Sequence, residues 1–427
     1  LLSGWRQVGK STSVAHFGEC HFDDTYHLNF LMDPELKRCF DDPNPKLVIA
    51  KLESRRSRKI IPGKTLLILD EVQSCPQAIE ILGHFRDAFP KLHVLACGTF
   101  VDFSKESFEF SVPVGRVTYL SLNPLSFKEF LVAIDEIELS QKLDNTSWET
   151  SISGEQHQKL LDLMNEYMMV GGMPAVVSAY VHSNRCMATV REEQRQLWRS
   201  VRDAFSNMTQ DIVGENSEQL LLKMLHAIIQ EVKDLSQLST HLDTQSMSTV
   251  VNRVFQSGLF SQINAISSEQ DSVFLPINEE NIFRTAFIDV GLLHYALTAD
   301  NNQTLTNPLQ QYGGMIARQF IAQHLLISSK GTAALKYPRL LQQGQGTFEF
   351  SHGEYAISMG ENPHSLFNND LSSSIKSIQM GVSPLVIRNN RLVCPLYLIE
   401  SSSSLAASAQ ENSANEFTNQ ATGFSVA

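Results

Sequence analysis

A glycine-lysine motif at the start of the sequence restricts what the chain can fold into. Residues 4–11 read GWRQVGKS and fit the pattern G-x-x-x-x-G-K-[ST] at every fixed position. Glycines at these places let the backbone curl, so that successive N–H groups point inward at a polyphosphate. The motif therefore predicts a strand, a phosphate-binding loop and a helix whose positive N-terminal end faces a nucleotide.

Each residue of this loop is a candidate for contact with the nucleotide. We expect Lys10 to reach the β- and γ-phosphates of ATP and the Ser11 hydroxyl to ligate Mg²⁺. The nucleotide-binding candidates are Gly4, Trp5, Arg6, Gln7, Val8, Gly9, Lys10, Ser11 and Thr12. The alternative is a chance glycine-rich turn, because only three residues precede the motif. That short start also indicates a sequence truncated at its N-terminus.

A second stretch supports the nucleotide interpretation. Residues 65–71, TLLILDE, form a short apolar run followed at once by two acids, as in a buried parallel strand. Asp70 would hold Mg²⁺ directly or through water, and Glu71 would orient and deprotonate the attacking water. The alternative is an ordinary strand that ends in a polar loop. The phosphate-binding motif earlier in the chain favours the nucleotide interpretation over this alternative.

Two further polar residues are catalytic candidates. Thr99 follows the apolar run 92–96 and is placed to sense the γ-phosphate, although a plain turn explains it as well. Arg116 precedes another strand, predicted at 117–120, and would stabilise transition-state charge within the chain or across a subunit boundary. A surface arginine is an equal alternative. The basic run 51–64 is interpreted as a solvated helix end and loop.

Composition places limits on the class of protein. The chain has 427 residues, 42% of them hydrophobic and 19% charged, which is typical of soluble domains with real cores. No apolar run is long enough to span a membrane, and no signal peptide is visible. The six scattered cysteines indicate reduced thiols of a cytoplasmic protein. A net charge of −12 argues against nucleic-acid binding by bulk electrostatics.

Strands that alternate with helices over the first 125 residues predict a doubly wound parallel α/β sheet of the P-loop NTPase class. Along the chain, a further strand lies between the helix after the loop and the strand that ends at Asp70-Glu71. This favours the branch of these ATPases in which, within the sheet, another strand separates the strand before the loop from the strand before the two acids. The sequence also resembles a group of prokaryotic AAA-type ATP-binding proteins. Matching pieces are residues 4–12, 62–82, 90–100, 111–131, 167–177, 283–293 and 394–400.

The resemblance implies an N-terminal ATPase domain joined to a C-terminal region with a restriction-endonuclease-like part. It carries Gly4, Gly9, Lys10, Ser11, Asp70 and Glu71 over as the nucleotide site. We expect five segments: an ATPase core (1–125), a helical connector (126–212), a winged-helix-like region (213–295), a degenerate nuclease-like domain (296–400) and a disordered tail (401–427).

The C-terminal segments are less well defined. Residues 247–256 would be the recognition helix of a winged helix, but Arg253 is its one basic residue, which favours protein contacts over DNA. Asp289 is interpreted as a helix N-cap rather than a metal ligand. The nuclease-like segment has Arg318 where the resemblance implies an acid, and it lacks an E-x-K pair. We expect no nuclease activity from it.

These observations lead to a hypothesis and two alternatives. The chain would be a Mg²⁺-dependent ATPase that couples its nucleotide state to its C-terminal domains, with self-association as a further possibility. Alternatively, ATP would gate a regulatory module that binds DNA or a protein through the winged-helix region, with negligible turnover. A decayed gene product that folds poorly is the third option.

Overall fold

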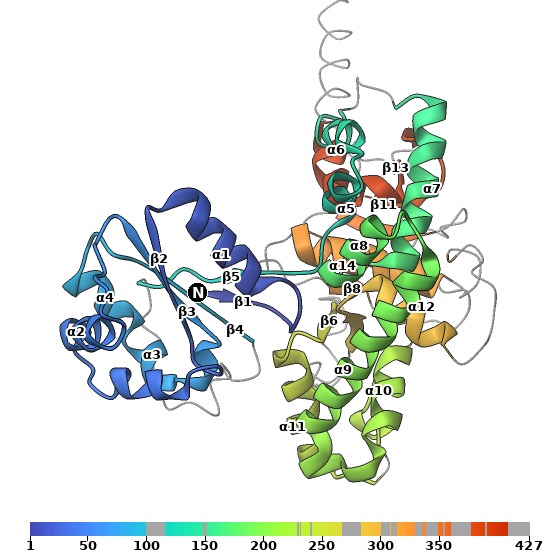
Figure 1. Cartoon of the computed structure of the whole chain (residues 1–427). Helices are drawn as coiled ribbons and strands as arrows, with labels where there is room; N and C mark the ends of the chain where they lie inside the picture. Colours follow the sequence, from blue (N-terminus) through green and yellow to red (C-terminus); the bar gives the residue numbers. More distant parts are fainter. Residues whose placement is uncertain are drawn as a thin grey trace, which may run out of the picture. The chain divides into compact units, whose positions relative to one another are not determined.

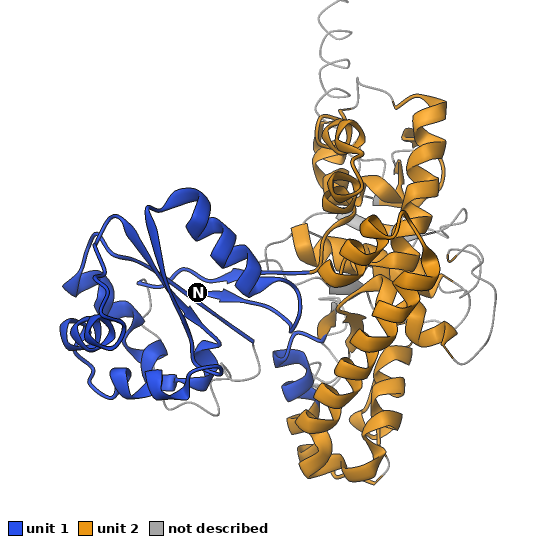
Figure 2. Ribbon diagram, viewed as in Figure 1, with its two compact units in different colours: residues 1–123, 251–259 blue, residues 124–250, 260–427 orange. Residues whose placement is uncertain are grey.

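The computed structural model describes residues 1–99, 116–147, 152–228, 230, 232–239, 241–266, 283–299, 308, 314–328, 336–338, 349–352, 355–359, 377–388 and 391–408. The chain divides into two compact units (Figure 2). Unit 1 comprises residues 1–123 and 251–259, and unit 2 comprises residues 124–250 and 260–427.

The described residues of unit 1 form a parallel sheet of five strands (Figure 1). The strands are β1 (Leu2–Ser3), β2 (Asp24–Asn29), β3 (Thr65–Asp70), β4 (His93–Gly98) and β5 (Leu120–Ser121), in the order β2-β3-β4-β1-β5. All four pairings are parallel. Strand β4 lies between β1 and β3, which confirms the expected separation of the two motif strands.

Helices cover both faces of this sheet, so the predicted doubly wound architecture is confirmed. Helix α1 (Lys10–His21) packs on one face through Val14, which joins a small cluster with Leu66, Ile68 and Cys97. The larger core lies on the other face, under α2 (Pro45–Arg56), α3 (Pro76–Glu80) and α4 (Leu82–Ala88). Residues 76–88 form two short helices, α3 and α4, which adjoin at Ile81.

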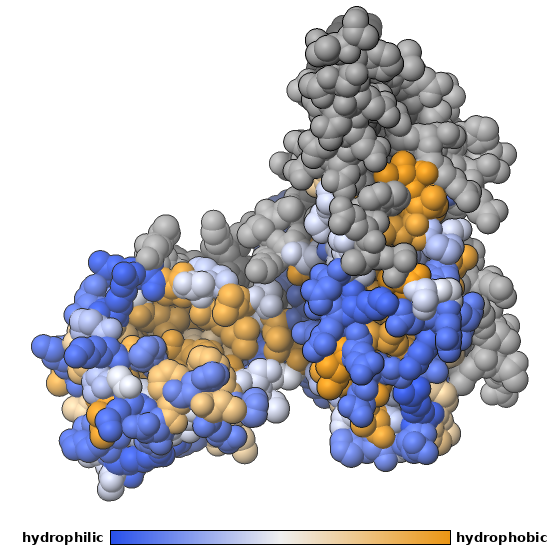
Figure 3. Space-filling model, turned by 90° about the horizontal axis from the view of Figure 1, so that it is seen from above, coloured by the Kyte–Doolittle hydropathy of each residue, from blue (hydrophilic) through white to orange (hydrophobic). Residues whose placement is uncertain are grey.

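The basic run at 51–64 is neutralised locally. Arg55 pairs with Asp33 at 3.0 Å, Arg58 pairs with Asp24, and Lys59 pairs with Glu53. These pairs lie on α2, on the loop after it and on neighbouring segments, so the structure favours the solvated helix end and loop. Figure 3 shows polar and apolar residues side by side on the surface of unit 1.

Unit 2 begins with a run of helices. They are α5 (Phe127–Ala133), α6 (Ile137–Asp144), α7 (Gly154–Val170), α8 (Pro174–His182), α9 (Met187–Val213), α10 (Ser217–His226), most of α11 (Thr244–Gln256), α12 (Val290–Thr298) and α14 (Met315–Ser328). Helix α5 starts with a capping box, in which Ser126 accepts from the Glu129 amide and Glu129 accepts from the Ser126 amide.

The second sheet belongs to unit 2 and has eight strands in the part of the chain that the structure describes. They are β6 (Phe260–Ile266), β7 (Phe283–Phe287), β8 (Lys336–Pro338), β9 (Glu349–His352), β10 (Tyr355–Met359), β11 (Ser377–Gly381), β12 (Val386–Arg388) and β13 (Arg391–Pro395), in the order β12-β13-β11-β10-β9-β8-β6-β7. Strands β6 and β7 form the antiparallel pair expected of a wing, yet β6 also pairs with β8. Before α11, where a winged helix has the first helix of its pair, the chain forms a single helical turn, Leu235–Gln237. A winged helix is therefore not confirmed.

A buried polar cluster joins the helices of unit 2. Asp289 is fully buried and caps α12 through the Leu292 amide at 2.9 Å, as predicted. Its other oxygen accepts from the Gly172 amide at 2.7 Å. Burial raises the pKa of Asp289 to about 6, although these amide bonds act in the opposite direction.

The first part of the predicted tail is helical. Residues 402–408 are helical and follow the turn Leu396–Ser401. Leu405 and Ala406 are buried, so two apolar side chains in a serine-rich segment suffice to anchor it. The rest of the predicted tail, 409–427, lies outside the described residues. In the described part of the chain, no helix is both long enough and apolar enough to cross a membrane.

Candidate functional site

The glycine-lysine loop connects β1 directly to α1. Gly9 caps the helix with φ 95° and ψ 12°, a left-handed conformation that favours glycine. Gln7 also has a positive φ of 63°, so the backbone reverses twice within a few residues. Gly4 lies against β5, and a Cβ there would stand 2.3 Å from the carbonyl oxygen of Leu122. Glycine at these two positions therefore has a steric reason.

The side chains of the loop divide into buried and exposed groups. Trp5 and Val8 are buried and support the loop from inside, whereas Arg6, Gln7 and Thr12 are exposed. These three reach solvent. The predicted residues therefore form one continuous loop. The loop backbone and the Lys10 side chain line the inside of this loop.

Lys10 folds back into the curl of the loop. It is 6% exposed, and its Nζ donates to the carbonyl oxygens of Gly4 at 3.0 Å and Trp5 at 2.8 Å. Burial lowers the pKa of Lys10 below its usual range, while the negative charges of Glu71 and Asp70 oppose that shift. The ammonium group is thus held beside both acids of the second motif.

Asp70 is the centre of a hydrogen-bond network across three neighbouring strands. Oδ1 accepts from the Ser11 hydroxyl at 3.1 Å, the Cys97 thiol at 3.0 Å and the Glu71 amide at 3.0 Å. Oδ2 accepts from Asn29 at 3.2 Å and lies 3.3 Å from Nε2 of His27. Burial acts to raise the pKa of Asp70, but the hydrogen bonds from His27, Cys97 and Ser11 outweigh it and hold the pKa at about 2.

This network includes side chains that sequence reasoning missed. Asn29 on β2 and Cys97 on β4 are the register partners of Asp70 on β3. Burial and the neighbouring Asp70 carboxylate raise the pKa of the Cys97 thiol, which keeps it protonated and able to donate. The signal was available in principle, because register partners lie side by side in a parallel sheet once the strand order is known.

Glu71 follows Asp70 in an unusual backbone conformation. Its φ of 54° and ψ of 42° are left-handed, which is uncommon for a residue with a side chain. Its carboxylate accepts a hydrogen bond from Nε2 of Gln73 at 2.5 Å. Thr99 is buried directly after β4, the strand next to β3. The structure therefore brings Glu71 and Thr99 to the carboxyl edge of the sheet, where the loop also lies.

Arg116 is not brought to this edge. It is half-exposed and forms an ion pair with Asp87, at the end of α4. It precedes β5 by four residues and so lies on the amino-terminal side of the sheet, whereas the loop follows the carboxyl end of β1. We therefore leave Arg116 out of the site that this chain builds on its own. A role across a subunit boundary stays a prediction.

The comparisons with known proteins agree with this geometry. Residues 1–131 match a family model described as an AAA domain. The N-terminal part of the chain is thus similar to AAA domains. The match spans unit 1 through β5 and reaches α5, and it includes the loop, Asp70 and Glu71.

Three solved structures illustrate the similarity. They are a Walker-type ATPase of Pyrococcus abyssi (11% identity, 69% of this chain and 89% of that chain, TM-score 0.39), the Orc1 protein of Aeropyrum pernix in complex with DNA (12%, 70% and 86%, 0.28) and Cdc6p of Pyrobaculum aerophilum (11%, 75% and 87%, 0.23). These TM-scores are too low to support an argument. No curated protein matches the sequence.

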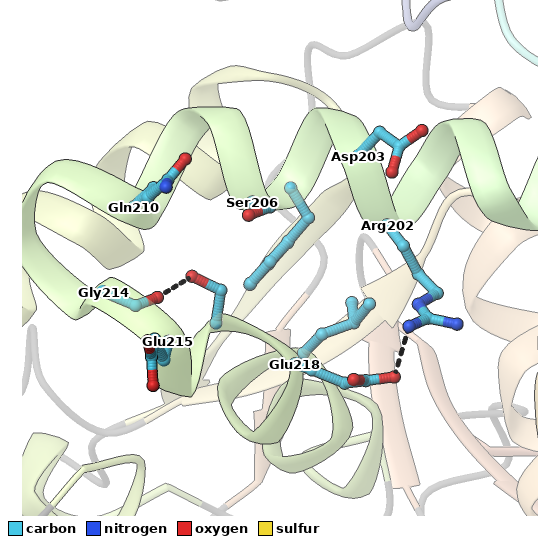
Figure 4. Close-up of a pocket in the computed structure, with 10 residues that line it drawn as sticks. Arg202, Asp203, Ser206, Gln210, Gly214, Glu215 and Glu218 are labelled. Carbon is cyan, nitrogen blue, oxygen red and sulfur yellow. Dashed lines mark hydrogen bonds and ion pairs between the residues drawn. The ribbon is translucent and has the colours of Figure 1, made fainter.

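A separate cavity of about 430 Å³ lies in unit 2, between α9 and α10 (Figure 4). An ion pair of 2.9 Å joins Arg202 and Glu218 at one side of it. Ser217 donates to the carbonyl oxygen of Gly214 at 2.9 Å on the other side. These two pairs account for part of the polar lining, and the lining as a whole indicates no particular ligand. Among the described residues, no group of three or more His, Cys, Asp or Glu is arranged to hold a metal ion.

Proposed function

We propose that unit 1 binds ATP with Mg²⁺ and hydrolyses it. The observation that carries the proposal is the convergence of Lys10, Ser11 and Asp70 around the loop, with Ser11 Oγ and Asp70 Oδ1 at 3.1 Å. The donor set fits Mg²⁺, because a hydroxyl and an ionised carboxylate are hard oxygen ligands. When bound, Mg²⁺ would neutralise charge on the β- and γ-phosphates.

The residues of the chain have distinct roles in this proposal. The ammonium group of Lys10 exchanges its two loop carbonyls for phosphate oxygens, which are stronger acceptors because they are charged. The low pKa of Asp70 keeps it ionised at neutral pH. Glu71 takes a proton from the attacking water, and Thr99 bonds the γ-phosphate or that water.

Binding and turnover are tested separately with substitutions in the full chain. Lys10→Ala should abolish ATP binding, whereas Glu71→Gln should bind ATP and release no phosphate. Lys91→Ala is the matched control, because Lys91 is exposed and precedes β4 at the opposite edge of the sheet. Binding by Lys10→Ala equal to that of the wild type would show that the site is assigned wrongly. Binding without turnover in the wild type would favour the regulatory module.

Coupling of the nucleotide state to unit 2 is the finer part of the proposal. Leu122, near the end of unit 1, donates to the Ser3 carbonyl at 2.7 Å and packs against Gly4. Three residues later, the Leu125 amide donates to Gly172 at 2.7 Å, and the Phe127 amide donates to His324 at 2.9 Å. Hydrogen exchange at these two amides should change when ATP binds. Unchanged exchange at both would argue against coupling by this route.

A further inference from the structure

The side chain of Gln73 connects Glu71 with the end of β4. Its Nε2 donates to Oε2 of Glu71 at 2.5 Å. Its Oε1 packs against Gly98, where a Cβ would stand 2.3 Å away. The amide therefore fills the space between the Glu71 carboxylate and the strand that leads to Thr99.

The hydrogen bond fixes which way the amide points. A carboxylate only accepts hydrogen bonds, so the NH₂ group of Gln73 must face Glu71 and the oxygen must face Gly98. That oxygen is buried, and no donor reaches it from the residues that the structure describes. An unpaired buried acceptor costs about 1–3 kcal/mol, which offsets most of what one bond to a carboxylate contributes. The contact is therefore a poor device for stabilising the fold.

The backbone conformation of Glu71 also argues that this contact does not serve the stability of the fold. A left-handed non-glycine residue costs on the order of 1–3 kcal/mol, and such strain persists where the surrounding structure imposes it. Here the strained residue and the unpaired amide oxygen are two positions apart and joined by a hydrogen bond. Both unfavourable features serve to place one carboxylate.

We propose that Gln73 is a positioning residue, which holds the Glu71 carboxylate in the orientation that accepts a proton from the attacking water. The inference rests on the proposed function, because it takes Glu71 as the base. In that step the water oxygen bonds to the γ-phosphorus, and the bond from this phosphorus to the β–γ bridging oxygen breaks. Its electron pair leaves on ADP, and one water proton passes to Glu71.

The structure offers two independent ways to disturb the contact. Gln73→Leu removes the donor, and Gln73→Glu keeps the size of the side chain while replacing the donor with an acceptor. Gly98→Ala instead pushes the amide from its other side, because the new Cβ would overlap Oε1. Gln77→Leu is the matched control, since Gln77 is exposed on the neighbouring helix α3.

The measurement is steady-state ATP hydrolysis with Mg²⁺ by the full chain, with folding checked by thermal melting. We expect Gln73→Leu and Gln73→Glu each to lower kcat by about tenfold to a hundredfold, with KM within about twofold of wild type, because misplacing a catalytic group has effects of this size. Gly98→Ala should lower kcat similarly, and the Gln73→Leu/Gly98→Ala double variant should be no slower than the slower single variant.

Several results would overturn the inference. An unchanged kcat in Gln73→Leu, or full activity in Gln73→Glu, would show that the amide only fills space. A rise in kcat would show that it restrains Glu71 instead. These outcomes are distinct from a failure of the proposed function. The proposed function fails if the wild type does not hydrolyse ATP, or if Glu71→Gln hydrolyses ATP as fast as the wild type does. In that case the inference falls with it.

Discussion

The hydrogen bonds to Asp70 predict how unit 1 responds to acid. Burial alone would raise the pKa of this carboxyl, but its hydrogen-bond donors hold the pKa at about 2, against 3.8 for an ordinary aspartate. A group whose folded pKa is depressed stabilises the fold above its unfolded pKa. That contribution is lost as the pH falls through the folded pKa. Asp70 should therefore stabilise unit 1 at neutral pH and progressively less below pH 4.

The size of the effect follows from the two pKa values. At about 1.4 kcal/mol per pKa unit, the shift corresponds to about 2 kcal/mol, of which about 1 kcal/mol is lost by pH 3. Asp70→Asn removes the titrating group. The free energy of unfolding of wild type should exceed that of Asp70→Asn at pH 7, and the difference should shrink by about 1 kcal/mol at pH 3.

Fluorescence can follow unit 1 by itself. The chain has three tryptophans, and Trp5 lies buried in the loop of unit 1. A Trp148→Phe/Trp198→Phe background leaves Trp5 as the reporter in urea denaturation. Asp87→Asn is the control, because Asp87 is exposed on α4. The difference in unfolding free energy between wild type and Asp87→Asn should not shrink by about 1 kcal/mol from pH 7 to pH 3. A difference between wild type and Asp70→Asn that is equal at both pH values, or larger at pH 3, would refute the reasoning.

Two further predictions concern single residues. Asp289 has a raised pKa of about 6, against 3.8 for an ordinary aspartate, so unit 2 should lose about 2 kcal/mol of stability as the pH rises from 4 to 7. Trp198 fluorescence in a Trp5→Phe/Trp148→Phe background measures this loss, and a loss of equal size in Asp289→Asn would contradict it. Arg116→Ala should keep kcat within about twofold where the chain is monomeric, because an exposed ion pair contributes little. A tenfold fall at every protein concentration would place Arg116 in the site after all.

Much of unit 1 follows from sequence because its signals are local. The loop motif, the strand that ends at Asp70 and the alternation of strands and helices each depend on residues close together in the chain. Together they predicted the parallel sheet and the strand between β1 and β3. The helix start at Asp289 is predictable for the same reason, since a cap involves only the next few residues.

The remaining features depend on contacts between distant segments. Asn29 and Cys97 reach Asp70 only because three strands align in one register, and no spacing in the sequence encodes that alignment. The role proposed for Gln73 depends on its contact with Gly98, which lies at the end of another strand. The helical segment 402–408 was assigned to the tail on composition, although burial of Leu405 decides otherwise.

The strand order also determines when the loop can form during folding. Strand β1 pairs with β4 and β5. Leu2 therefore cannot pair until Cys97 and Leu120, about a hundred residues further along the chain, have been made. Closing such long segments is slow, because the chain loses entropy before the contacts compensate. On the ribosome, β2 and β3 can pair while β1 still has no neighbour. The first residues to be made in this sequence are therefore among the last of unit 1 to reach their final place.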